Sequence, residues 1–128
     1  MPTGLANRRI KILVADEPAE WVRRFDRLFV FKPVDFIVTG RSLNKLDELK
    51  TGNLDLAMIA GDIPGFDGLE LARRIHRLMS DLPVIMLGSK KSRHWFEQAL
   101  QAGVKSVIPR PIDITQLVEL TVKCLCIN

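Results

Sequence analysis

The sequence is poor in the residues on which several classes of protein depend. It has no tyrosine, aromatic residues make up only 6% of its 128 positions, and its two cysteines, Cys124 and Cys126, both lie near the end. Two such closely spaced cysteines supply no disulfide framework, and no cluster of His or Cys nearby completes a zinc site, so we interpret them as two buried helix cysteines. The scarcity of aromatic residues argues against a surface that stacks single-stranded nucleic acid.

Long apolar runs are also missing. None approaches the roughly 18 residues of a membrane span, and the start, Met1-Pro2-Thr3-Gly4, has no signal-peptide core. Hydrophobic residues still make up 47% of the chain, enough for one packed domain, and the net charge of +4 permits an acidic partner without requiring one. We expect a single cytoplasmic domain over residues 1–128, with residues 1–8 as a short extension. Whether the chain is complete or one domain of a longer protein stays open.

Short apolar runs alternate with amphipathic segments along the whole chain. The predicted strands are residues 10–15, 34–38, 54–60, 83–87 and 104–108. The predicted helices are residues 18–29, 42–50, 69–79, 92–103 and 113 to about 124, with Ser92 and Asp113 as caps. Helical spacing turns one set of side chains inward, namely Trp21, Phe25, Leu28 and Phe29 in the first helix and Leu71, Ile75 and Leu78 in the third.

Five strand–helix units predict an α/β fold with a parallel sheet and helices on both of its faces. In such a sheet the functional site lies in the loops that follow the carboxyl ends of the strands. The four loops singled out in this way are residues 16–17, 60–68, 88–91 and 109–112.

Two adjacent acids, Asp16 and Glu17, end the first strand. Carboxylate oxygens are the ligands that Mg²⁺ takes, so the pair is a candidate metal site. Acids at a helix start also interact favourably with the helix dipole, which needs no metal. The pair alone leaves both interpretations open.

Four stretches of the sequence, residues 11–18, 55–68, 82–89 and 102–111, stand in the order and spacing of a response regulator receiver domain. The chain resembles that family from about residue 9 to residue 124. The resemblance implies a flavodoxin-like three-layer sandwich whose five-stranded parallel sheet has the order 2-1-3-4-5. It also implies a role in two-component or phosphorelay signalling.

By position, Asp16 and Glu17 match the acidic pair that holds Mg²⁺ in this family. A register shifted by one residue would make Ala15 and Asp16 the pair. We favour the first assignment, because the shift would turn charged side chains of the following helix toward the core, and burial of unpaired charge is costly.

The chain departs from the family at the residues that carry out phosphoryl transfer. The phosphoacceptor aspartate is replaced by Ala60, and a methyl group cannot form an acyl phosphate. Gly88 stands where the family has a Ser or Thr after the fourth strand, and Ser89 comes one residue later. Val107 stands in place of the family's switch aromatic residue, and Arg110 stands in place of its lysine. The sequence therefore predicts a pseudo-receiver with no catalytic residue and no required cofactor.

The pocket residues that remain are predicted to hold one fixed state. The resemblance implies a cis bond between Arg110 and Pro111, and we expect the Arg110 guanidinium to pair with Asp16 or Glu17. We expect Asp62, two residues past the acceptor position, to face solvent or to cap a turn. The alternative is that Asp62 lies at the mouth of the pocket, where its carboxylate would bind a metal or accept a phosphoryl group as a surrogate for the missing aspartate. The predicted pocket comprises Asp16, Glu17, Asp62, Ser89, Arg110 and Pro111.

The expected function is non-enzymatic signalling through contact with a protein, such as a histidine kinase, an output domain or a second copy of the chain. The arginines of the first helix fit kinase docking, and Trp95 fits either a dimer surface or the core. Membrane and nucleic-acid partners are not expected. Two alternatives are phosphorylation at Asp62 or Glu17, and a small-anion site built from Ser89–Ser92 and Arg110.

Overall fold

The computed structural model describes residues 9–41 and 53–126, and within them all five predicted strands and four of the five predicted helices are present. The strands are β1 (Ile10–Ala15), β2 (Val34–Val38), β3 (Leu56–Ala60), β4 (Val84–Leu87) and β5 (Val104–Ile108). The helices are α2 (Trp21–Leu28), α3 (Gly68–Leu78), α4 (Arg93–Gln101) and α5 (Ile114–Leu125). The helix predicted over residues 42–50 lies outside the described residues. None of the helices within them is long and apolar enough to cross a bilayer.

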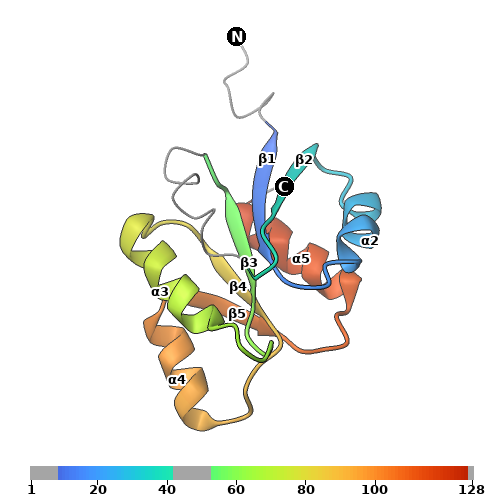
Figure 1. The fold of residues 1–128 in the computed structure, drawn as a ribbon. Coiled ribbons are helices and arrows are strands. Elements are labelled where there is room, and N and C mark those ends of the chain that lie inside the picture. The colour runs from blue at the N-terminus through green and yellow to red at the C-terminus, as the bar shows by residue number, and fades with distance from the viewer. Residues whose placement is uncertain (1–8, 42–52, 127–128) are drawn as a thin grey trace.

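The five strands form one parallel sheet in the order β2-β1-β3-β4-β5, which confirms the predicted flavodoxin-like topology (Figure 1). Helices α3 and α4 cover one face of the sheet, and α2 and α5 cover the other. The order brings the carboxyl ends of β1, β3 and β4 to the middle of one edge. The loops that follow these strands are therefore neighbours, although they are far apart in the sequence.

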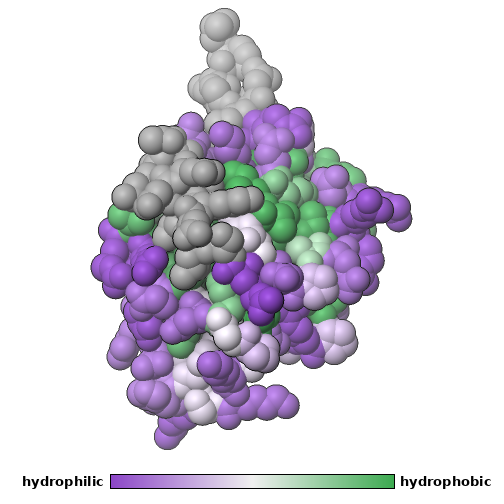
Figure 2. Space-filling view, in the orientation of Figure 1, coloured by the Kyte–Doolittle hydropathy of each residue, from purple (hydrophilic) through white to green (hydrophobic). Residues whose placement is uncertain are grey.

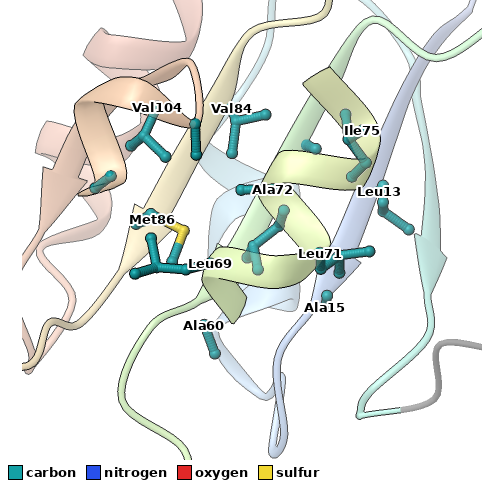
Figure 3. Packing of buried hydrophobic residues seen from close by; sticks show 14 of the residues in the cluster. Leu13, Ala15, Ala60, Leu69, Leu71, Ala72, Ile75, Val84, Met86 and Val104 are labelled. Carbon is teal, nitrogen blue, oxygen red and sulfur yellow. The ribbon is translucent and has the colours of Figure 1, made fainter. Parts of the chain in front are cut away.

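The central strand β3 is buried along its whole length, and the side chains of residues 56–59 alternate between two cores. Ala57 and Ile59 belong to the cluster under α3 and α4. Figure 3 shows this cluster from close by, with Leu71 and Ile75 of α3 among its labelled members. Met58 packs on the opposite face, under α2 and α5. This two-residue period, with both faces covered, explains why the strand is an almost unbroken apolar run.

Two residues predicted to point inward do not. Leu28 is 46% exposed and Leu78 is 50% exposed. Each is the last residue of its helix, and the residue after it takes the core-facing direction instead. Phe29 is buried, with its ring stacked on Phe25 at 5.4 Å between centroids, and Met79 packs against the core under α3.

The helices that follow β3, β4 and β5 each begin at a side-chain cap. Asp67, Ser92 and Asp113 accept hydrogen bonds from the amides three residues later, at 3.0, 3.0 and 3.1 Å. The caps predicted at Ser92 and Asp113 are thereby confirmed. Because a cap fixes where a helix begins, it also fixes the loop that precedes the helix at the carboxyl edge of the sheet.

Candidate functional site

Three charged side chains meet at the carboxyl edge of the sheet. Asp16 follows β1, Asp62 lies two residues past β3, and Arg110 lies two residues past β5. The Arg110 guanidinium binds Asp16 through Nη1 and Nη2, at 3.2 and 2.8 Å. Its other edge binds Asp62, with Nε 3.0 Å from Oδ2 and Nη2 3.2 Å from Oδ1. We call this arrangement the acid–arginine–acid network.

The Asp16 carboxylate is 1% exposed and its hydrogen-bonding capacity is filled. Oδ1 accepts from the Glu17 amide and from Arg110 Nη2, both at 2.8 Å. Oδ2 accepts from Trp21 Nε1 at 2.8 Å and from Arg110 Nη1 at 3.2 Å. A carboxylate offers about four lone-pair sites, and these four donors take them.

Asp62 occupies space that is free because residue 88 is glycine. A Cβ built on Gly88 would overlap the Asp62 carboxylate. Gly88 also has a φ of +77°, a backbone conformation that residues with a side chain rarely adopt. The Gly88 amide donates to the Ile108 carbonyl at 2.7 Å, which holds the loop in this position. Gly88 is therefore the residue that lets Asp62 turn toward Arg110.

Arg110 lies in a half-buried position, with 33% of its side chain exposed. Burial acts to lower the pKa of Arg110, but the hydrogen bonds and charges of Asp16 and Asp62 together outweigh it and raise the pKa. The two carboxylates thus favour the charged form of the guanidinium, and with both of them ionised the network carries one net negative charge. The Arg110–Pro111 peptide bond is cis, as predicted.

Ala60 ends β3 beside this network and is fully buried. It pairs in register with Leu87 of β4 and belongs to the apolar cluster under α3 (Figure 3). The start of α3 lies directly over it, since a Cβ built on Gly68 would overlap the Ala60 carbonyl oxygen. The side chain is a methyl group, which offers neither a nucleophile nor a ligand.

The structure separates the two adjacent acids. Glu17, expected in the pocket beside Asp16, lies outside the network, 51% exposed, with Oε2 3.2 Å from Nε of Arg41. The strand ends at Ala15 and the chain bends at Glu17, so the two adjacent side chains take different directions. The expectation that Asp62 faces solvent or caps a turn is wrong, because its carboxylate binds Arg110 and is only 28% exposed. Ser89 lies half-buried directly after Gly88, in the loop that follows β4.

Trp21 is a site residue that the sequence analysis assigned to the core alone. It is buried, and its indole N–H donates to Asp16 across the turn between β1 and α2. A signal for it was present, because a buried indole N–H needs an acceptor and Asp16 ends the buried strand just before this helix. Val107, at the switch position, lies half-buried in β5.

Comparison with known proteins agrees with the fold and with the order of these segments. The family model of the response regulator receiver domain matches residues 12–122. The cyclic di-GMP phosphodiesterase response regulator RpfG of Xanthomonas campestris is 37% identical over 80 residues, which cover 61% of this chain and 21% of that protein. The chemotaxis protein CheY-3 of Vibrio cholerae is 28% identical over 121 residues, which cover 91% of this chain and 92% of that protein.

Solved structures show the same architecture. A CheY-like receiver domain protein from Methanospirillum hungatei aligns with a TM-score of 0.76 at 21% identity, covering 92% of this chain and 94% of that one. The receiver domain of an HD domain-containing protein from Pseudomonas fluorescens aligns with a TM-score of 0.76 at 24% identity, covering 92% of this chain and 88% of that one. Receiver domains are in general non-enzymatic signalling modules that contact kinases and output domains. The chain belongs to the response regulator receiver domain family of two-component signalling.

Proposed function

We propose that this domain is a pseudo-receiver, which signals through protein contact without being phosphorylated. One observation carries the proposal: residue 60, at the end of β3 where the family has its phosphoacceptor aspartate, is a fully buried alanine. Phosphorylation of a receiver requires a carboxylate oxygen as nucleophile at this place. A methyl group supplies none, so the conventional reaction has no starting point.

The acid–arginine–acid network supports a domain held in one state. In the family the lysine and the hydroxyl after the fourth strand contact the phosphoryl group. Here Arg110 is already bound to two carboxylates, and the space at Gly88 is filled by Asp62. At these two positions, therefore, the places that a phosphoryl group would occupy are already taken by Asp16 and Asp62.

The same contacts make the pocket a poor fit for Mg²⁺, so we propose that no cofactor is required. A hard cation needs several oxygen ligands with free lone pairs. Asp16 has none left, Glu17 pairs with Arg41, and Asp62 is bound by Arg110. The guanidinium stands between Asp16 and Asp62, where it neutralises part of their charge.

Two exposed surfaces support a protein partner. Phe96 and Leu100 on α4 are 43% and 74% exposed, and Arg24 and Arg27 on α2 are exposed beside the start of α5. Trp95 is buried, so it acts in the core and not as a dimer contact. The proposed partners are a histidine kinase, an output domain or a second copy of the chain, and the proposed compartment is the cytoplasm.

The test is the intact mass of the protein after incubation with acetyl phosphate and Mg²⁺, with a conventional receiver domain treated in parallel. We expect no added phosphoryl group on this chain and one on the control. A base-labile adduct on this chain would overturn the proposal. Asp62→Asn and Glu17→Gln variants would then show which carboxylate had accepted it.

A reversion series tests whether the other departures matter. Ala60→Asp restores the carboxylate alone, and a second variant adds Asp62→Asn, Gly88→Thr and Arg110→Lys. We expect rapid, Mg²⁺-dependent labelling only in the combined variant, because in Ala60→Asp the network still occupies the pocket. Labelling of Ala60→Asp at the rate of the control receiver would show that the network does not block the reaction. Circular dichroism would verify that both variants fold.

A further inference from the structure

A second cavity lies beside the acid–arginine–acid network, between the starts of α3 and α4. Its volume is about 440 Å³, and none of the three residues of the network lines it. Pockets for small molecules occupy about 300–1,000 Å³, so the cavity has the size of a ligand site. Nothing in the pseudo-receiver proposal assigns it a role.

Basic side chains from three separate segments line this cavity. They are Arg73 of α3, Lys90 of the loop after β4, and His94 of α4. Asp67 is the acid that the described residues contribute to the lining, and its Oδ1 already accepts the Glu70 amide at 3.0 Å. The lining is therefore basic on balance.

Arg73 keeps most of its donors available. Its Nη1 lies 3.4 Å from Oε2 of Glu70, while the guanidinium has five N–H groups, so donors remain for a ligand. The surface over α3 and α4 is hydrophilic (Figure 2), and its exposed Arg74 and Arg77 pair with Glu70 at 3.7 and 3.5 Å. These two arginines lie outside the cavity lining, so the charge at the site is set by Arg73, Lys90 and Asp67.

The floor of the cavity is apolar. Phe66, Leu69 and Trp95 line it and are 7%, 6% and 5% exposed. Gly61 lets the indole approach, since a Cβ there would come within 2.8 Å of Cζ2 of Trp95. Cations at the rim and an apolar floor fit a ligand that has an anionic group and a carbon skeleton. A bare phosphate ion would leave most of the volume unfilled.

We propose that the α3–α4 cavity binds a small organic phosphate, such as a mononucleotide or a sugar phosphate. Arg73 and Lys90 bind the phosphate oxygens, because a guanidinium forks onto two oxygens and an ammonium acts as a point charge. Asp67 and Ser92 each take one first-turn amide, those of Glu70 and Trp95, so these two amides are not available to the phosphate. The organic part rests against the floor formed by Phe66 and Trp95.

The test is a titration of the ¹⁵N-labelled full chain with AMP and with ribose 5-phosphate, followed by NMR. Adenosine and ribose, which lack the phosphate, are the control ligands. The two indole signals provide an internal comparison, because Trp95 lines the cavity and Trp21 is held by Asp16 outside it. We expect a saturable shift of the Trp95 signal with at least one phosphate, and none of the Trp21 signal.

Matched variants then locate the site. Arg73→Ala and Lys90→Ala should each weaken binding about tenfold, the loss expected for one charge-assisted contact. Arg74→Ala removes the same charge from the same helix but does not line the cavity, and should leave binding unchanged. The proposal is overturned if no ligand gives a saturable shift up to about 10 mM, far weaker than a specific site. It is also overturned if adenosine or ribose acts as its phosphate does, or if Arg74→Ala weakens binding as Arg73→Ala does. Phosphorylation of the domain would refute the pseudo-receiver proposal and leave this site untouched.

Discussion

Removal of Arg110 should destabilise the domain much more than removal of Asp62, although the two residues share an ion pair. Arg110→Ala takes two of the four hydrogen bonds from Asp16, whose carboxylate is 1% exposed. Asp62→Ala takes a carboxylate that is 28% exposed and leaves the pair between Arg110 and Asp16 in place. The difference follows from which partner is left buried and unpaired.

The expected magnitudes follow from these exposures. Leaving a buried charge without its partner costs about 3–5 kcal/mol. We expect about 3 kcal/mol for Arg110→Ala, the low end of that range, since a third of the arginine side chain is exposed and water can enter the space it leaves. For Asp62→Ala we expect about 1 kcal/mol, the upper end for a partly exposed pair.

The assay is urea unfolding followed by tryptophan fluorescence. With an unfolding slope of about 2 kcal/mol per molar urea, the midpoint should fall by about 1.5 M for Arg110→Ala and about 0.5 M for Asp62→Ala. Arg23→Ala, at an exposed position on α2, is the control and should shift the midpoint little. The double variant should be no less stable than Arg110→Ala, because Asp62 then has no cation to bind. Equal losses for the two single variants would refute the reasoning.

Three further predictions concern the same edge of the sheet and the end of α5. Gly88→Thr should lower the free energy of unfolding by about 3 kcal/mol, from backbone strain and overlap with Asp62, and Asp62→Ala should restore part of the loss. The stability difference between wild type and Arg110→Ala should stay constant from about pH 7 to 10. The pKa of Arg110 is raised by its carboxylates against the opposing effect of burial, so its contribution is lost only as the pH rises through that raised value. Cys124 should be alkylated more slowly than the exposed Cys126, because burial raises the pKa of the Cys124 thiol.

Each of these has a control or a contradicting result. Gly65 has the same φ of +77° with nothing near its missing Cβ, so Gly65→Thr measures the backbone strain alone. If Gly88→Thr costs no more than Gly65→Thr, Asp62 does not fill the space at Gly88. A stability difference that falls steadily over the stated pH range would contradict a charged Arg110. Peptide mapping after partial alkylation would contradict the cysteine prediction if Cys124 reacted first.

The strands could be predicted from the sequence because they are apolar runs with clear breaks. Residues 34–38 and 104–108 match β2 and β5 at both ends, since Pro33 and Gly103 precede them. The helix ends were harder, and Leu28 and Leu78 show why. The periodicity shows which side of a helix faces the core, but it does not show whether the last leucine or the residue after it is buried there.

The location of the site could be predicted from the sequence, but its ion pairs could be predicted only in part. Topology alone places Asp16 and Arg110 at the carboxyl edge of the sheet, and their pairing was expected. The direction of Asp62 was not predictable from its neighbours, because it depends on the space left by Gly88 in another loop. The separation of Asp16 from Glu17 depends on where the extended chain ends and α2 begins, within a turn of a few residues.

The substitutions at the pocket make physical sense together and not one at a time. Asp62 can turn inward only if residue 88 has no side chain, and Gly88 without Asp62 would leave unfilled space beside a half-buried cation. One guanidinium can bind two carboxylates, one on each edge, but a third acid at residue 60 would add to the net negative charge that the network already carries. Ala60 supplies no such acid. The alanine at residue 60 and the network are thus two parts of one electrostatic arrangement, and an aspartate introduced at residue 60 alone would oppose it.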